Sequence, residues 1–249
     1  MVNLVLGIDG GGTSCRAALA TASGDIIGQG RSGPANIMTD LEGARENIAE
    51  AARLAFVDAG QDESLLSRTA AVLGLAGTNV GGYKQRLEAI LPFRRSLVES
   101  DAVIALNGAL GDRDGAIAII GTGSIFMARK GGHIQTIGGW GFLLGDLGGG
   151  ARIGRNLLQQ TLLAHDDIRP GSALTGAVME HFGGDPREIV KFGASARPAD
   201  FGGFAPMVFD HADRKDIVAL RVISRAIGDI EEALDALQLS ADDILCLLG

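Results

Sequence analysis

The feature that most constrains the fold of this chain is a strand–turn–strand unit that occurs twice. Residues 4–20 form an apolar strand, the turn Gly-Gly-Gly-Thr and a second strand of small or apolar side chains. The same order returns in residues 116–128, where the turn reads Gly-Thr-Gly-Ser. A supersecondary unit repeated at this scale predicts two similar lobes that each present one glycine hairpin to a shared cleft.

Both turns suit a phosphate group. Consecutive glycines let backbone N–H groups point at a ligand that no Cβ obstructs, and the hydroxyls of Thr13, Thr122 and Ser124 are further donors. Asp9 ends the first strand and could hold Mg²⁺ through water, because this ion keeps several waters and often uses only one or two carboxylates. The alternative is a glycine hairpin that only closes a sheet. Two such turns in one chain favour a nucleotide site.

Neither turn is one of the commoner phosphate loops. The chain has no Gly-Lys dipeptide, which excludes a Walker A loop. It also has no G-x-G-x-x-G sequence that opens a helix, which excludes the dinucleotide-binding fingerprint. Phosphate binding would therefore depend on the two hairpins.

Composition excludes several function classes. Apolar residues make up 46% of the 249 residues, which is typical of a globular protein of one large or two small domains. The net charge of −8, without basic runs, disfavours a nucleic-acid partner. Cys15 and Cys246 form neither a disulfide framework nor a metal-ligand spacing. The absence of a leader pattern or a long apolar run predicts a cytoplasmic protein with no membrane partner.

Hydrophobic spacing predicts the remaining elements. A helix is expected from Thr39 or Asp40 to about Ala59, with apolar residues at helical intervals. From Ala151 onward the pattern is mostly helical, and residues 244–249 are expected to form one more buried strand. Because the second unit also opens with strands, each lobe is expected to begin with an antiparallel meander.

The two turns together resemble the paired phosphate motifs of the sugar kinase, Hsp70 and actin superfamily. These motifs are Asp9-Gly10-Gly11-Gly12-Thr13 and Gly121-Thr122-Gly123-Ser124. Three further stretches, at residues 34–36, 99–102 and 138–146, resemble the N-acetylglucosamine kinase branch of the BadF/BadG/BcrA/BcrD ATPase family. The resemblance implies an α/β, two-lobed actin-like ATPase (ribonuclease H-like) fold, each lobe a mixed sheet flanked by helices. We expect an N-terminal lobe over 1–110 and a C-terminal lobe over 111–249.

Asp101 is the candidate catalytic residue. It lies where a strand gives way to a helix, and a carboxylate there could accept the proton of a substrate hydroxyl that attacks phosphorus. An Asp at this place can also be a simple helix N-cap. The resemblance implies that Asp101 is the base, whereas Glu99 does not match the motif position.

The sugar-binding residues are expected in two loops. Asn36 can donate to and accept from sugar hydroxyls, or can serve a turn. Residues 138–150 contain seven glycines around Trp140 and Asp146, as in loops where backbone meets ligand. From composition alone Trp140 could be a wall for the sugar or a core residue. The resemblance implies that the sugar contacts Asn36, Asp101, Gly139, Trp140, Gly141 and Asp146.

The chain departs from the family pattern at three places. It reads Gly-Asp-Leu-Gly-Gly at 145–149, where the family often has Gly-Asp-Glu-Gly-Ser, which leaves the exact sugar open. Lys215 stands where many relatives have a glycine near the nucleotide. After the strand at 244–249 the family continues with a glycine-rich turn against the adenosine, a strand and a helix. We therefore expect a chain that ends at Gly249 to bind ATP more weakly than a longer one.

The predicted function is ATP-dependent phosphorylation of an amino sugar, foremost N-acetylglucosamine at its 6-hydroxyl. The hairpins would hold the phosphates of ATP, with Mg²⁺ on Asp9, and Asp101 would deprotonate the sugar. One alternative is an ATPase that activates a partner enzyme, although Cys15 and Cys246 are poorly arranged for the iron–sulfur cluster of such activators. Another is a non-catalytic sugar or nucleotide sensor. The resemblance also implies a homodimer.

Overall fold

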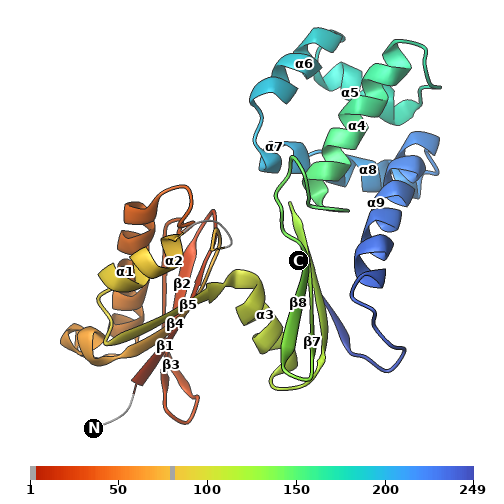
Figure 1. Cartoon of the computed structure of the whole chain (residues 1–249). Coiled ribbons are helices and arrows are strands. Elements are labelled where there is room, and N and C mark those ends of the chain that lie inside the picture. The colour runs from red at the N-terminus through yellow and green to blue at the C-terminus, as the bar shows by residue number, and fades with distance from the viewer. Residues whose placement is uncertain (1–3, 79–81) are drawn as a thin grey trace. The chain divides into compact units, whose positions relative to one another are not determined.

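The computed structural model describes residues 4–78 and 82–249, and these fall into two compact units, Met1–Gly108 and Ala109–Gly249. Figure 1 shows their elements along the chain. Each unit contains one mixed sheet that buries apolar side chains against at least one helix. The α/β class and the mixed sheets predicted from the sequence are thus confirmed.

The N-terminal unit is a five-stranded sheet in the order β3-β2-β1-β4-β5. Strands β1, β2 and β3 form an antiparallel meander, and β4 and β5 are parallel to β1. The strands are β1 (Leu4–Gly10), β2 (Cys15–Thr21), β3 (Ile26–Ser32), β4 (Ala70–Leu75) and β5 (Arg95–Ser100). The helices are α1 (Leu41–Asp58), the 3₁₀ helix η1 (Glu63–Arg68), α2 (Tyr83–Ile90) and α3 (Asp101–Leu110).

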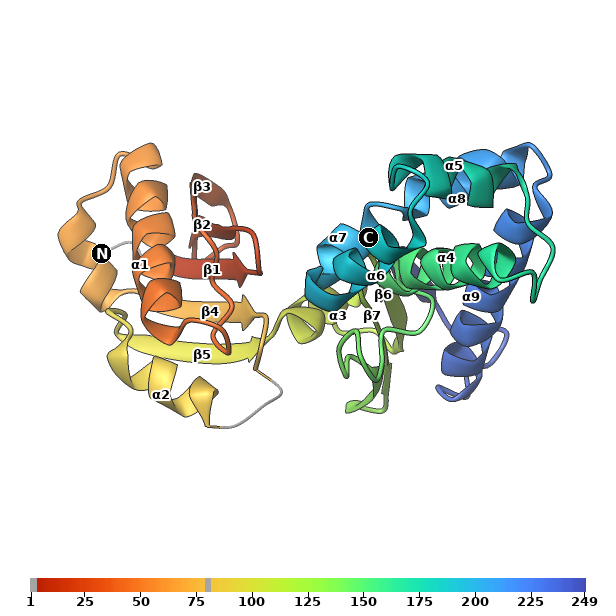
Figure 2. The same ribbon diagram turned by 90° about the horizontal axis from the view of Figure 1, so that it is seen from above.

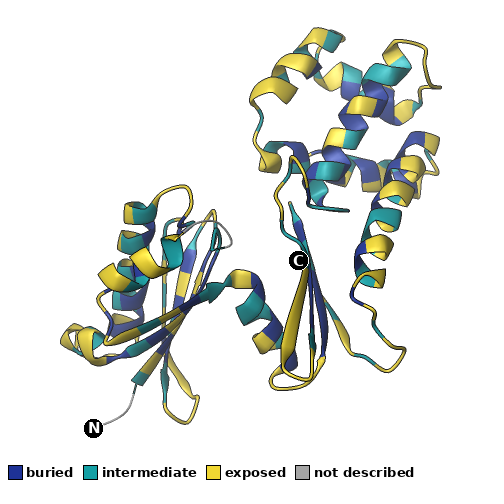
Figure 3. Ribbon diagram, in the orientation of Figure 1, coloured by how far each residue is buried: buried dark blue, intermediate teal, exposed yellow. Residues whose placement is uncertain are grey.

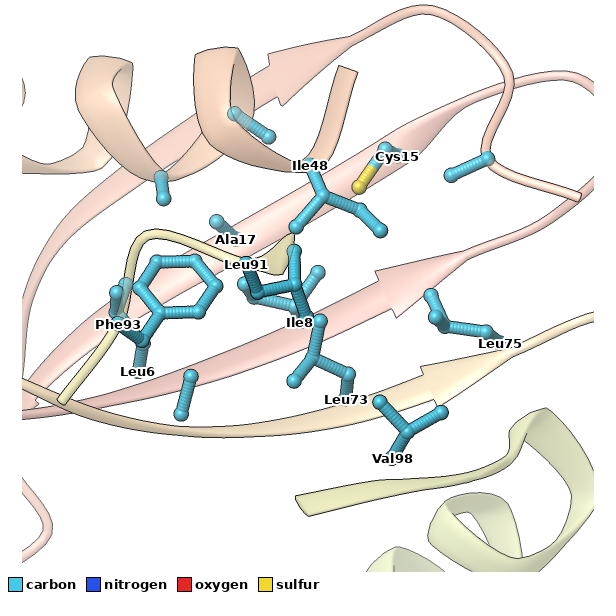
Figure 4. Close-up of a cluster of buried hydrophobic side chains, with 14 of the residues drawn as sticks. Leu6, Ile8, Cys15, Ala17, Ile48, Leu73, Leu75, Leu91, Phe93 and Val98 are labelled. Atoms are coloured by element: carbon cyan, nitrogen blue, oxygen red, sulfur yellow. The ribbon is translucent and has the colours of Figure 1, made fainter. Parts of the chain in front are cut away.

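The core of this unit lies between α1 and the sheet. Helix α1 begins at Asp40, whose carboxylate accepts a hydrogen bond from the N–H of Gly43, so Asp40 rather than Thr39 is the cap. Its alanine-rich face lies close to β3, where a Cβ on Gly30 would stand 2.0 Å from the carbonyl oxygen of Ala51. Leu6, Ile8 and the other side chains of Figure 4 fill the space between helix and strands.

The sheet of the C-terminal unit has four strands in the order β8-β7-β6-β9, which corresponds to β3-β2-β1-β4 of the first sheet. Its first three strands are again an antiparallel meander, and β9 is parallel to β6. The strands are β6 (Gly115–Ile120), β7 (Ser124–Lys130), β8 (His133–Gly138) and β9 (Leu245–Leu248). Residues 244–249 were predicted as a buried strand, and this is wrong in one respect, because Leu247 of β9 is 71% exposed. Figure 3 shows that β8 is also largely exposed.

Six helices complete the C-terminal unit and have a core of their own. They are α4 (Gly150–His165), α5 (Ala173–His181), α6 (Pro186–Ser195), α7 (Pro198–Gly202), α8 (Ala205–Asp213) and α9 (Ile217–Asp235). Helices α5, α7, α8 and α9 all contact α4, which Figure 2 shows running through this group. The rings of Phe182, Phe192, Phe201 and Phe204 pack together, with centroids 5.2–5.8 Å apart in the paired rings. The predicted helical character after residue 151 is confirmed.

Candidate functional site

The first glycine hairpin joins β1 to β2 and is closed by a hydrogen bond from the N–H of Gly11 to the carbonyl of Ser14, 3.0 Å long. Its glycines have different surroundings. A Cβ on Gly10 would stand 2.6 Å from Leu75 Cδ2, so Gly10 is required for packing. For Gly11 and Gly12 such an atom would have no described neighbour within 4 Å. These two glycines therefore leave open the space that a phosphate needs.

Asn36 lies beside this hairpin because the N–H of Ala35 donates to the carbonyl of Gly11 at 2.9 Å. The Asn36 side-chain oxygen accepts from the N–H of Met38 at 3.0 Å, so the turn interpretation of this residue is correct for its oxygen. The same oxygen lies over Gly77, which has a left-handed φ of 87° and no room for a Cβ. The amide NH₂ of Asn36 is the group that could donate to a ligand.

Asp101 is the first residue of α3 and follows β5 directly. Its Oδ1 accepts from the N–H of Ala102 at 2.8 Å, and Ser100 Oγ accepts from Val103 at 3.2 Å. Burial of its carboxylate raises the pKa of Asp101 above the ordinary 3.8. The hydrogen bond from Ala102 opposes this increase, and the negative charge of Asp9 adds to it. The raised pKa indicates that Asp9 and Asp101 are electrostatic neighbours. A base in this position would still be accessible, since the residue is exposed.

The strand register explains why Asp9 and Asp101 are close together. Asp9 of β1 pairs with Gly74 of β4, and Gly74 pairs with Glu99 of β5, two residues before Asp101. A Cβ on Gly74 would stand 2.0 Å from Ile104 of α3, so this glycine lets α3 approach the sheet. Glu99 itself forms an ion pair with Lys84 at 3.1 Å, which gives it a structural partner.

The carboxylates of Asp9 and Asp101 suit Mg²⁺ that is held largely by water and nucleotide oxygens. In residues 4–78 and 82–249 no group of three or more His, Cys, Asp or Glu side chains could hold a metal ion. A metal bound here would therefore need ligands from water or from its substrate.

The second hairpin joins β6 to β7 and is tied to the start of α4. The carbonyls of Gly121 and Thr122 accept from the N–H groups of Gly150 at 2.8 Å and Ala151 at 2.9 Å. Thr122 is exposed, whereas Ser124 is only 6% exposed and its hydroxyl donates to the Leu147 carbonyl at 2.7 Å. The exposed hydroxyl of this turn is therefore that of Thr122, and the hydroxyl of Ser124 holds the following loop.

The glycine-rich loop after β8 folds back onto this hairpin. Asp146 has a left-handed φ of 55°, and a Cβ on Gly123 would stand 2.7 Å from its Oδ2, so Gly123 leaves room for the carboxylate. Burial raises the pKa of Asp146, while the N–H groups of Ser124 and Gly141 and the charge of Arg152 oppose this. The structure thus brings Gly121, Thr122, Gly123 and Asp146 together within one unit.

The other residues predicted in this loop are exposed or have unusual backbones. Gly139 and Gly141 have left-handed φ values of 72° and 82° that favour glycine. Trp140 is 78% exposed, which rules out the alternative of a core residue. Leu143 and Leu144 are 79% and 88% exposed. With Leu143 and Leu144, the exposed ring of Trp140 forms an apolar stretch of this loop that could cover a ligand.

Sequence reasoning missed an apolar cavity of about 560 Å³ that begins at the second hairpin. Its wall includes Ile120, Gly121, Thr122, Pro206, Phe209 and Ile227. The isoleucines of α9 had a helical spacing, but spacing alone does not tell which side chains face a cavity. The cavity has the size and the apolar wall of a small-molecule site.

Lys215 and Asp216 connect α8 to α9 at the edge of these helices. Lys215 has a left-handed φ of 62°, which explains physically why a glycine is favoured there. The Asp216 carboxylate accepts from Val218, Ala219 and Leu174 N–H groups and from Ser172 Oγ, at 2.8–3.0 Å. These bonds lower the pKa of Asp216 despite burial, and they hold α5 against α9.

Comparison with known proteins identifies the relatives of this fold and site. The sequence model of the BadF/BadG/BcrA/BcrD ATPase family matches residues 6–248. The chain therefore belongs to this family of ATPases.

Individual relatives agree. Glucosamine kinase GspK of Vibrio cholerae is 38% identical over 252 residues, covering 100% of this chain and 85% of the relative. A Chromobacterium violaceum protein, solved as a proposed N-acetylglucosamine kinase, superimposes with a TM-score of 0.89 at 30% identity, covering 100% of this chain and 87% of that one. A ROK hexokinase of Thermus thermophilus shares the fold alone, with a TM-score of 0.53 at 19% identity over 99% of this chain and 81% of that one.

No helix in the described part of the chain combines the length and the apolar character needed to cross a membrane.

Proposed function

We propose that this protein is an ATP-dependent amino-sugar kinase that works in the cytoplasm, where ATP is available. The observation that carries the proposal is that each unit combines a glycine hairpin, which exposes a threonine, with a carboxylate. Asp101 and Asp9 accompany the first hairpin, and Asp146 lies against the second. The 38% identity with a glucosamine kinase along the whole chain supports the same activity.

The hairpins would bind the phosphates of ATP. The candidates are the N–H group of Gly12 and the hydroxyls of Thr13 and Thr122, which lie in exposed turns. The N–H groups of Gly11 and Gly121 instead close the two hairpins by donating to the carbonyls of Ser14 and Gly123. Gly10, Gly123 and Ser124 would act by shaping these turns. Mg²⁺, when bound through Asp9, would supply positive charge that neutralises the phosphates. The apolar cavity between the second hairpin and α8 would take the adenosine, since its wall is apolar and includes Gly121 and Thr122 of the phosphate turn.

Asp101 would be the general base. Its carboxylate accepts the proton of the sugar 6-hydroxyl, the oxygen forms a bond to the γ-phosphorus, and the bond to ADP breaks. The raised pKa of Asp101 makes it a stronger base than an ordinary carboxylate while ionised. Glu99 is unsuited because it is paired with Lys84.

Each unit has its own candidate groups for binding the sugar. Asn36 NH₂ can donate to a hydroxyl, Asp146 can accept from two, and the backbone at Gly139 and Gly141 offers further bonds. The exposed ring of Trp140 can cover the apolar face of the sugar.

Two sugars are candidates. N-acetylglucosamine follows from the family branch, and glucosamine is favoured by the relative with 38% identity. The two differ in one chemical requirement: the ammonium group of glucosamine needs a carboxylate partner, whereas the acetamide needs neutral donors and acceptors.

The position of Cys15 disfavours the alternative of an ATPase that activates a partner enzyme. Cys15 is fully buried in strand β2 of the N-terminal unit, so its sulfur is not presented at the surface to a cluster. We also propose a homodimer, on the resemblance, which light scattering of the purified protein would test.

The decisive assay is ADP release with Mg-ATP, without sugar and with glucosamine, N-acetylglucosamine or glucose. We expect release that depends on an amino sugar and that falls at least about 100-fold in Asp101→Asn. Release that is equal without sugar would refute the kinase and favour an activator. The position of the phosphoryl group would be read by NMR of the product.

A further inference from the structure

A second pocket of the C-terminal unit lies between helices α4 and α9, which pack against each other. It measures about 270 Å³ and shares Gly148, Ile153 and Ala226 with the apolar cavity. Apart from Val222, its remaining wall is polar: Arg152, Arg155, Asn156 and Gln159 come from α4, and Arg225 and Asp229 from α9. No role in the proposed phosphoryl transfer has been given to any of them.

The charges of this pocket do not balance. Three guanidinium groups face one carboxylate, in a chain whose net charge is −8. Arg152 lies 3.8 Å from Asp229 and thereby takes up the only carboxylate among the described lining residues. Arg155 lies over the Phe142 ring at 6.0 Å, and Arg225 is exposed. Since arginine stays protonated, two of these cations lack an anionic partner within the pocket.

We propose that this pocket binds a small phosphate-bearing anion, with Arg155 and Arg225 as its main ligands. Guanidinium groups bind phosphate through two parallel hydrogen bonds, and two of them on facing helices can hold one dianion. Asn156 Oδ1 already accepts from Gln160, so its NH₂ group remains as a neutral donor. Such a donor, with Gln159, suits the hydroxyls of a sugar phosphate, while the arginines suit inorganic phosphate equally.

Arg152 connects this pocket to the glycine-rich loop. Its Nη1 donates to the carbonyl of Gly145 at 3.2 Å, and its charge acts on the neighbouring Asp146. A dianion in the pocket would compete for Arg152 and offset this charge. If the proposed kinase function holds, occupation of the pocket weakens sugar binding, and a phosphorylated product would inhibit its own formation.

The test is calorimetry of the protein without nucleotide, at fixed ionic strength, with inorganic phosphate and with glucosamine 6-phosphate as probes. Arg225→Gln is expected to weaken binding about tenfold, the usual worth of a charge-assisted contact. The matched control is Arg221→Gln, which removes an exposed charge from the same helix outside the pocket and is expected to leave binding unchanged. Thr122→Ala serves as a control for phosphate bound at the hairpin.

The outcomes separate the two proposals. Three outcomes would each overturn the pocket proposal. Binding could be lost in Thr122→Ala but kept in Arg225→Gln, it could weaken equally in Arg221→Gln and Arg225→Gln, or no binding could be detected. Tighter binding of the sugar phosphate than of phosphate would identify the sugar phosphate as the ligand, and equal binding would identify the phosphate group alone. Because calorimetry needs no turnover, an inactive protein would refute the kinase and leave this result standing. With an active enzyme, phosphate should raise the KM for sugar in the wild type and in Arg221→Gln but not in Arg225→Gln.

Discussion

The two glycine hairpins have the same topology but different supports. In the first, the carbonyls of Gly10 and Gly11 accept from loop residues Ala76 and Ala35, and Gly11 and Gly12 stay open. In the second, the carbonyls accept from the first N–H groups of helix α4, and the carboxylate of Asp146 fills the space at Gly123. The same strand–turn–strand unit thus gives an open turn in one unit and a turn joined to a second loop in the other.

The largest effect should follow from removing the carboxylate beside the first hairpin. Asp101→Asn should lower kcat by about 10²–10⁴, the usual contribution of a general base.

The same change should raise the stability of the folded protein at neutral pH. The pKa of Asp101 in the folded protein lies above the 3.8 of the unfolded chain, so folding favours the protonated carboxyl group. This contribution to stability is present below pH 3.8 and is lost as the pH rises through the folded-state pKa, whereas the neutral side chain of Asn carries no such loss. Thermal unfolding at pH 7 and near pH 4 checks the sign, and a less stable variant at pH 7 would contradict it.

A matched pair of glycine substitutions sharpens the comparison within the first hairpin. Gly10→Ala should destabilise the protein by about 1–3 kcal/mol, because its Cβ would meet Leu75 and Ala35. Gly12→Ala should change stability by less than about 0.5 kcal/mol and weaken ATP binding instead. Denaturant unfolding and an ATP titration measure the two effects. Equal destabilisation by both changes would show that Gly12 is not in an open turn.

The two hydroxyl residues of the second hairpin, Ser124 and Thr122, should also differ in whether they affect stability or ATP binding. Ser124→Ala removes a buried hydrogen bond to the Leu147 carbonyl and should cost about 1 kcal/mol of stability. Thr122→Ala should leave stability nearly unchanged and raise the KM for ATP. Thermal unfolding beside steady-state kinetics separates these effects. If Ser124→Ala left stability unchanged and raised the KM for ATP, the hydroxyl of Ser124 would be identified as a phosphate ligand instead.

The smallest expected effect concerns the pH dependence at the first hairpin. Asp9 raises the pKa of Asp101 by charge repulsion, so Asp9→Asn should move the Asp101 titration to lower pH. In the wild type, kcat/KM should fall as pH drops through the pKa of Asp101, because only the ionised carboxylate accepts a proton. NMR of the labelled carboxyl group reports the titration even where Asp9→Asn abolishes turnover. A titration that stays in place would contradict the electrostatic effect of Asp9 on Asp101.

Much of the fold followed from local pattern. The strand–turn–strand repeat predicted both meanders, and the capping role of Asp40 was one of two possibilities in the sequence. The sequence left open whether Asn36 serves a turn or a ligand, and it did not show that Ser124 donates to Leu147. Those choices depend on residues that become neighbours only after folding. The exposure of Leu247 was missed for a related reason, since an apolar run looks the same in a central and in an edge strand.

The sequence by itself determined the class of this protein, because glycine turns, strand patterns and acidic residues at strand ends are local features. Through the resemblance that these features carry, the sequence placed the chain among sugar kinases and singled out Asp9, Asp101 and Asp146. The tertiary structure decided which side chains and turns these three carboxylates lie beside. Only the register through Gly74 puts Asp9 near Asp101, and only the return of the loop to Gly123 puts Asp146 at the second hairpin. The cationic pocket between α4 and α9 also depends on packing, because scattered arginines form a site only where two helices bring them together.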